Sequence, residues 1–204
     1  MTEDQVVAAL MPHAQPIKGF FKTAMRRYKE EYEPSARADH DVSIQAQCLH
    51  GHIIKEASTY AAAFPDSEVK LGNSNGLKHL LVNGNIALRF KKVDCELQPS
   101  NNETAQSIAY RCGASMAGIE ADVRLDAGYR LNSAGDEIQS VHIIRWCSPR
   151  RTQWHFELLD DEIKSAVIPL FPVPEEYPDE PPAEIRGKPS NVVELKPTEN
   201  DHDE

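Results

Sequence analysis

The chain has 204 residues, a size at which one folded core is the rule and two complete domains would be cramped. Its formal net charge is −10, and ten acidic against three basic residues give residues 169–204 a net charge of −7. The remaining −3 on residues 1–168 excludes a domain that is basic overall, as most nucleic-acid-binding domains are.

This uneven composition predicts two parts, a single α+β domain over residues 1–168 and a disordered acidic tail over residues 169–204. The tail holds eight of the 14 prolines, and it has too little apolar surface to offset the entropy cost of ordering it. Its apolar island from Asn191 to Leu195 is either part of an inert solubilising tail or a segment that folds on a partner.

The four cysteines form no Cys-x-x-Cys pair, and the sequence contains neither a long apolar run nor a charged-then-apolar leader. These features predict a cytoplasmic protein with reduced thiols and no membrane partner.

Helices are predicted first along the chain. Residues 2–33 read as helix in one or two pieces, interrupted by Pro12 and Pro16. A longer helix follows, in which apolar residues recur in steps of three and four and form a stripe along one face. The stripe consists of Val42, Ala46, Leu49, Ile53, Ala57, Tyr60 and Phe64. Asp39 or Asp41 is expected to cap this helix, and the stripe packs on the first helix or on a partner.

From Val69 the apolar pattern changes to period two, and Asn83-Gly84 predicts a β-hairpin with a two-residue turn. The predicted pairs are Val82 with Asn85, Leu80 with Ala87, and Lys78 with Arg89. The predicted core face consists of Leu77, His79, Leu81, Ile86, Leu88 and Phe90.

A short helix over residues 100–110, capped by Ser100 or Asn101, precedes three more strands. These strands are predicted over residues 122–132, 137–146 and 152–158. The order of elements predicts an α+β fold, with N-terminal helices packed on an antiparallel sheet built from hairpins.

The predicted hairpin brings Lys78 opposite Arg89 and puts Lys91 on the same face. Like charges placed opposite each other repel, so either they are solvated or an anion lies between them. The pattern therefore predicts an anion- or partner-binding face, which Arg124 and Arg130 on a later strand would extend.

Cys48, His50 and His52 look like metal ligands, but residues two apart on a helix point about 200° apart. We therefore expect no metal site, and the absence of phosphate-loop, dinucleotide, zinc-peptidase and serine-hydrolase motifs predicts no cofactor. His50 remains a candidate acid–base group, against the ordinary reading of a half-buried polar histidine. Asp122 and Asp126 are acids at a strand end that could assist such chemistry.

Several stretches, taken in order, resemble an uncharacterised family of bacterial and prophage proteins. They are Leu49 to Ile53, Val82 to Gly84, Leu88 to Lys92, Ser100-Asn101 with Thr104 and Gln106, Ala127 to Tyr129, and Trp154 to Leu158. The likeness spans residues 37–158 and departs between Cys112 and Ala121, where the family has a loop with proline and leucine. The positions to which it draws attention are His50, Arg89, Lys91, Lys92, Asn101 and Tyr129.

Proteins of this kind are similar to companions of helix-turn-helix regulators and of peptidases like those that cleave phage repressors. The resemblance implies a protein partner and a toxin–antitoxin-like or phage-defence cassette, and no catalytic role transfers with it. We therefore expect a protein-interaction module. The alternative is an RNA- or nucleotide-directed toxin, in which His50 transfers protons and Arg89, Lys91 and Lys92 hold a phosphate.

Overall fold

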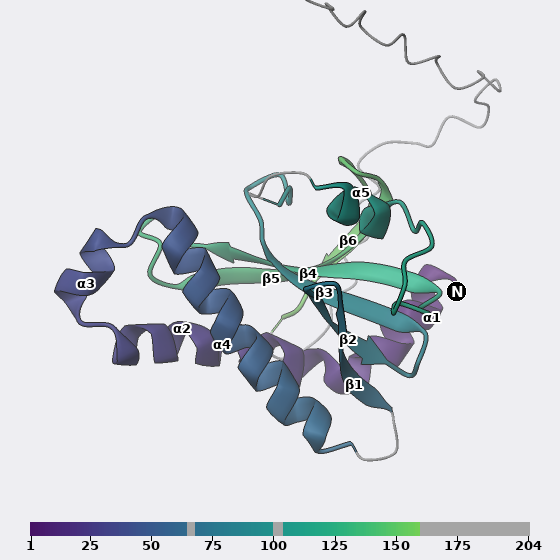
Figure 1. Ribbon diagram of the computed structural model, residues 1–204, viewed down its shortest axis with the longest axis horizontal. Helices are drawn as coiled ribbons and strands as arrows, with labels where there is room; N and C mark the ends of the chain where they lie inside the picture. The colour runs from purple at the N-terminus through teal and green to yellow at the C-terminus, as the bar shows by residue number, and fades with distance from the viewer. Residues whose placement is uncertain (65–67, 100–103, 160–204) are drawn as a thin grey trace, which may run out of the picture. The chain divides into compact units, whose positions relative to one another are not determined.

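The computed structural model describes residues 1–64, 68–99 and 104–159. They form an N-terminal set of helices packed with a six-stranded, mostly antiparallel sheet, which confirms the predicted α+β fold (Figure 1). The predicted tail, residues 169–204, lies outside the described residues.

The chain begins with a series of helices. They are α1 (Glu3–Leu10), a 3₁₀ turn (Met11–His13), α2 (Ala14–Glu31) and α3 (Pro34–Asp39). Pro12 falls in the 3₁₀ turn and Pro16 in the first turn of α2, where a missing N–H costs little. The predicted interruption of the first helix is confirmed at Pro12 and is wrong at Pro16, which α2 accommodates in its first turn.

The long helix α4 (Val42–Ala62) begins at Asp41, whose carboxylate accepts hydrogen bonds from two free backbone N–H groups, at 2.7 and 2.8 Å. Leu49, Ile53 and Ala57 are fully buried, which confirms the centre of the predicted stripe. Its first member, Val42, was expected to pack on the first helix or on a partner, and it is 64% exposed. Packing within this chain therefore does not extend to the first turn of α4.

The strands lie in the sheet in chain order. They are β1 (Val69–Ser74), β2 (Leu77–Val82), β3 (Ile86–Lys92), β4 (Val123–Leu131), β5 (Ile138–Ser148) and β6 (Arg151–Glu157). All neighbours in the described sheet are antiparallel except β3 and β4, which run parallel. A parallel pair needs a crossover, and helix α5 (Ala105–Arg111) lies in this connection.

The two faces of the sheet are covered differently. Helices α2 and α4 pack on one face, and α5 lies on the other (Figure 1). The face under α2 and α4 carries the main core, which includes Leu80, Val82, Ile86, Leu88, Phe90, Leu125, Ala127, Tyr129, Val141 and Ile143. A smaller cluster under α5 consists of Leu77, Ala87, Tyr110 and Ile119.

The predicted register of the β2–β3 hairpin is wrong by one residue. Val82 pairs with Ile86 and Leu80 with Leu88, so the turn has three residues, with Asn83 and Gly84 at positive φ. A slip of one residue turns every side chain of one strand to the other face. Leu80 and Val82 therefore lie in the main core, and Lys78 does not lie opposite Arg89.

Helix α5 begins later than predicted. Its cap is Thr104, whose side chain and that of Ser107 form a reciprocal capping box with the backbone. The predicted caps, Ser100 and Asn101, lie outside the described residues. Within the part of the chain that the structure describes, no helix combines the length and apolar character needed to cross a membrane.

Candidate functional site

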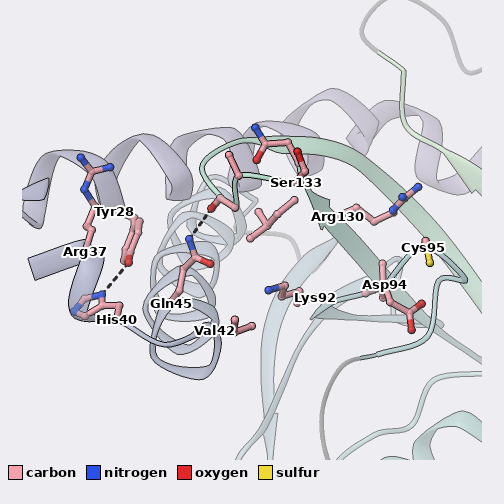
Figure 2. A pocket seen from close by; sticks show the side chains of 15 residues that line it. Tyr28, Arg37, His40, Val42, Gln45, Lys92, Asp94, Cys95, Arg130 and Ser133 are labelled. Carbon is pink, nitrogen blue, oxygen red and sulfur yellow. Dashed lines mark hydrogen bonds between the residues drawn. The ribbon is translucent and has the colours of Figure 1, made fainter.

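Lys92, one of the predicted binding residues, lies in a hollow of about 470 Å³. We call this the basic hollow and define it by Arg37, Val42, Gln45, Lys92 and Arg130 among its lining residues. Figure 2 shows Lys92 pointing into its middle, toward Val42 and Gln45, with Arg37 and Arg130 at opposite ends.

The walls of the basic hollow come from elements far apart in the sequence. Lys92 ends β3, where it pairs with Tyr129 of β4. The Gln45 side chain of α4 donates to the carbonyl of Gly135 at 2.6 Å, which fastens the start of α4 to the turn between β4 and β5. The Asn132 side chain accepts from the backbone of Asp136 at 3.0 Å and stabilises that turn.

Positive charge dominates this surface. Within the described residues, Arg37, Lys92 and Arg130 form no ion pair. The acid that lines the hollow, Asp94, accepts hydrogen bonds from the backbone N–H groups of Glu96 and Gln98, at 2.9 and 2.8 Å. Burial also lowers the pKa of Lys92, which marks its ammonium as short of both water and a partner.

An exposed apolar side chain borders these charges. Val42 lines the hollow at 64% exposure. Isolated apolar side chains on a surface are ordinary, but this one adjoins a concave basic site. The combination can hold an anionic group together with a neighbouring apolar side chain.

Arg89, also a predicted binding residue, is structural. It is 3% exposed and makes a bidentate ion pair with the fully buried Asp126, with N–O distances of 2.7 and 2.8 Å. Burial alone would lower the pKa of Arg89, but the Asp126 carboxylate raises it. Register explains the pair, since Arg89 of β3 lies directly beside Asp126 of β4.

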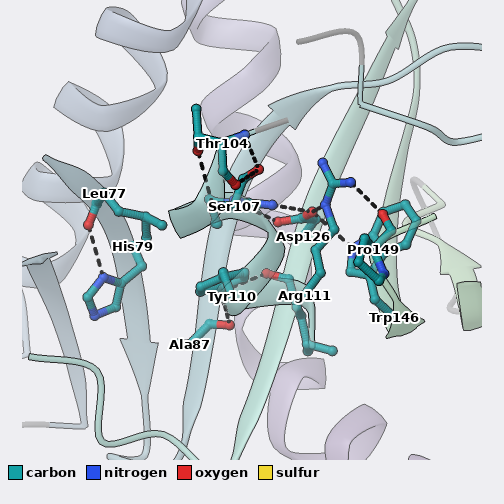
Figure 3. Close-up of polar contacts among 12 residues, drawn as sticks. Leu77, His79, Ala87, Thr104, Ser107, Tyr110, Arg111, Asp126, Trp146 and Pro149 are labelled. Atoms are coloured by element: carbon teal, nitrogen blue, oxygen red, sulfur yellow. Dashed lines mark hydrogen bonds and ion pairs between the residues drawn. The ribbon is translucent and has the colours of Figure 1, made fainter. Parts of the chain in front are cut away.

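Aromatic and basic side chains complete this buried network, which Figure 3 shows under α5. The Trp146 indole donates to Asp126 at 2.9 Å, and the Arg111 guanidinium lies 4.0 Å from the same carboxylate oxygen. Arg89 and Arg111 also stack over the rings of Tyr110 and Trp146, at 4.5 and 4.9 Å. The Tyr110 hydroxyl donates to the carbonyls of two strands. These contacts fasten α5 and β5 to the β3–β4 pair.

Lys91 and Lys78 lie on opposite faces of the sheet, because Lys91 alternates with Arg89 on the α5 side and Lys78 with Leu80 on the α4 side. His50 lies on α4. Burial and the charges of Lys91, Lys78 and Arg89 lower the pKa of His50 to about 4. Burial and the charge of Arg89 likewise lower the pKa of Lys91. His50 is therefore neutral at pH 7 and a weak base, whereas efficient acid–base catalysis favours a pKa near the working pH.

The remaining predicted residues fall elsewhere. Tyr129 is a core residue at 2% exposure, with its ring 5.4 Å from that of Phe21. Asn101 lies outside the described residues. His52 pairs with Glu31 at 3.4 Å, and Cys48 donates to Tyr32, so they do not join His50. No group of three or more metal-ligating side chains gathers anywhere in the described ranges.

Sequence reasoning missed the partners of these residues. Asp126 stands between Leu125 and Ala127 in the middle of an alternating strand, where aspartate is unfavourable unless a buried cation compensates it. That position was the available signal for the Arg89 pair. Arg130 was expected to extend the basic face, whereas Arg37 gave no comparable signal, because the basic hollow unites α3, α4, β3 and the β4–β5 turn.

Comparisons with models of protein families, with curated proteins and with solved structures found no match to this chain.

Proposed function

We propose that this chain is a non-catalytic protein-interaction module whose basic hollow receives an acidic segment of a partner protein. The observation that carries the proposal is the line of three cations without ion-pair partners in the described residues, Arg37, Lys92 and Arg130, beside the exposed Val42. Their placement at the two ends and the middle suits an extended segment that carries several carboxylates.

The cations and the apolar side chain of this surface contribute differently to binding. Exposed charges steer the encounter with an acidic partner and fix its register, but each contributes little affinity alone. An apolar side chain packed on Val42 supplies the burial that a stable contact needs. The partner is therefore expected to carry an apolar residue among its acids.

The family resemblance supports a partner encoded nearby, such as a helix-turn-helix regulator or a repressor-cleaving-type peptidase in a toxin–antitoxin-like or phage-defence cassette. This part of the proposal depends on the ordered likeness alone. The matching residues are 49–53, 82–84, 88–92, 100–101, 104, 106, 127–129 and 154–158.

The test is co-expression of the tagged chain with the products of its neighbouring genes, followed by co-purification. Lys92→Glu reverses the central charge of the hollow. Lys55→Glu is the matched control, because it makes the same change at an exposed site away from the hollow. Lys55 lies on α4, about 20 Å along the helix axis from Val42.

We expect a neighbouring gene product to co-purify with the wild type and with Lys55→Glu, and to be lost with Lys92→Glu. Lys55→Glu should melt at the wild-type temperature, since exposed substitutions usually change stability by under about 0.5 kcal/mol. Lys92 is half-buried but has no ion pair to lose in the described residues, so Lys92→Glu should still unfold cooperatively near that temperature. Equal capture by the two variants, or no capture by the wild type, would reject the proposal.

The alternative, an RNA- or nucleotide-directed toxin, keeps one point in its favour, the positive charges that lower the pKa of His50. It requires growth arrest on expression that is abolished by His50→Gln. The interaction module requires no such arrest. A growth assay that compares the wild type with His50→Gln therefore separates the two candidate functions.

A further inference from the structure

Two histidines lie in contact on one face of the β5–β6 pair. His142 of β5 lies across from Glu157 of β6, and His155 of β6 lies across from Ile144. Side chains two residues apart on a strand share a face, so both histidines and Glu157 lie on the same side of the sheet. This side is opposite the main core, which contains the intervening Ile143. The two imidazole rings meet edge to face, with 5.9 Å between their centroids.

The ring of His142 is held in place but keeps one nitrogen without a partner. The residue is 9% exposed, and its Nε2 lies 3.0 Å from the hydroxyl oxygen of Ser140. Its other nitrogen, Nδ1, is buried and has no hydrogen-bond partner in the described residues. A buried polar atom without a partner is uncommon and costs free energy. It therefore points to a ligand that this strand pair does not itself supply.

Metal-binding histidines have the same arrangement. Such a histidine donates the N–H of one ring nitrogen to a neighbouring acceptor, which fixes the ring and leaves the lone pair of the other nitrogen for the ion. The contact with Ser140 suits the tautomer of His142 in which Nε2–H donates and Nδ1 carries the lone pair. The second imidazole, that of His155, is already in contact with this ring.

We propose that His142 and His155 form a binding site for a divalent transition-metal ion such as Zn²⁺. Imidazole nitrogen is a preferred ligand of these ions, and two imidazoles that share a tetrahedral Zn²⁺ have ring centres about 5 Å apart. The observed 5.9 Å is close to that value. Rotation about the Cβ–Cγ bond of histidine is a soft torsion, so the half-buried His155 can turn a nitrogen toward a shared ion at low cost.

The surroundings of the pair leave the other coordination positions open. Glu157, directly across from His142, is half-buried, and a carboxylate oxygen is a further ligand that Zn²⁺ accepts. Arg130 of β4 pairs with Ser140, and its positive charge acts against a cation here, which the carboxylate of Glu157 offsets. No finished three-ligand group exists among the residues that the structure describes, so water completes the coordination. The site does not depend on the proposed function.

Titration calorimetry of the full chain with Zn²⁺, its cysteines kept reduced, tests the site. Mg²⁺ is the control ion, because it prefers oxygen ligands to imidazole. We expect saturable Zn²⁺ binding by the wild type and an affinity at least about tenfold weaker in His155→Gln, which removes one ligand. His50→Gln is the matched control, since it removes another half-buried histidine, on α4, and should bind Zn²⁺ as the wild type does.

The histidine ring signals in NMR spectra locate the ion independently of affinity. His155→Gln and His50→Gln identify two of these signals, and His142→Gln identifies the third. The signals of His142 and His155 should shift together on addition of Zn²⁺, while that of His50 stays in place. If His142→Gln does not fold, the signal of His155 and the affinity of His155→Gln still decide the matter. Equal Zn²⁺ affinity in His155→Gln and His50→Gln, an unshifted His155 signal, or no saturable binding by the wild type overturns the proposal.

Discussion

The two faces of the sheet are built on different principles. Under α2 and α4, side chains such as Leu88, Leu125 and Ile143 meet in an apolar core, with little polar chemistry to satisfy. Under α5, the same strands present Arg89 and Asp126, and their buried charges require geometric pairing. Apolar side chains on the first face pack without specific partners, whereas each charged side chain on the second face needs one particular partner.

The largest effect is expected on the polar face. Asp126→Ala leaves Arg89 buried without its carboxylate and removes the acceptor of Trp146, so we expect a loss of about 3–5 kcal/mol in unfolding free energy. Urea unfolding followed by tryptophan fluorescence measures it. Glu120→Ala, an exposed acid, is the control and should change stability by under about 0.5 kcal/mol. A loss of under about 1 kcal/mol in Asp126→Ala would show that the pair is dispensable.

The apolar face should respond to cavities. Leu49→Ala removes a fully buried side chain from α4 and is expected to cost about 2–5 kcal/mol. Val42→Ala makes a smaller truncation on the same predicted stripe, at a residue that is 64% exposed, and should be nearly neutral. Chemical denaturation of both variants checks the difference. Similar losses in the two would mean that Val42 is covered in solution.

Acid should weaken the fold through histidines whose charged form is disfavoured. Burial, with the nearby His155 and Arg130, lowers the pKa of His142 from 6.5 to about 4. Between those values the unfolded chain binds more protons, so stability falls as pH drops from about 6.5 to about 4 and levels off below. His142 contributes up to about 3 kcal/mol to this loss. Unfolding curves at pH 7 and pH 5 should show a smaller difference in His142→Gln. An unchanged pH dependence contradicts this assignment.

The contrast between the faces also explains what the sequence could predict. Helix periodicity located Leu49, Ile53 and Ala57 because burial on a helix depends on local spacing alone. Asn83-Gly84 located the hairpin, but its turn has three residues instead of the predicted two, and the extra residue reversed the faces of β2.

Non-local geometry accounts for the remaining misses. Arg89 and Asp126 become neighbours because β3 and β4 pair in parallel, whereas the predicted sheet consisted of antiparallel hairpins. The basic hollow depends on a meeting of α3, α4 and two strand ends, for which no short motif exists. Lys92 was singled out as a position to examine, but its surroundings required the fold.

The central claim is that cations on this protein divide into Arg89, which holds the sheet, and Lys92, which receives a partner. The most direct measurement is the dissociation constant between the chain and its co-purified neighbour, for the wild type and for Lys92→Glu, by titration calorimetry. The account predicts an affinity at least about tenfold weaker in Lys92→Glu, with an unchanged melting temperature. An unchanged dissociation constant in Lys92→Glu would contradict it.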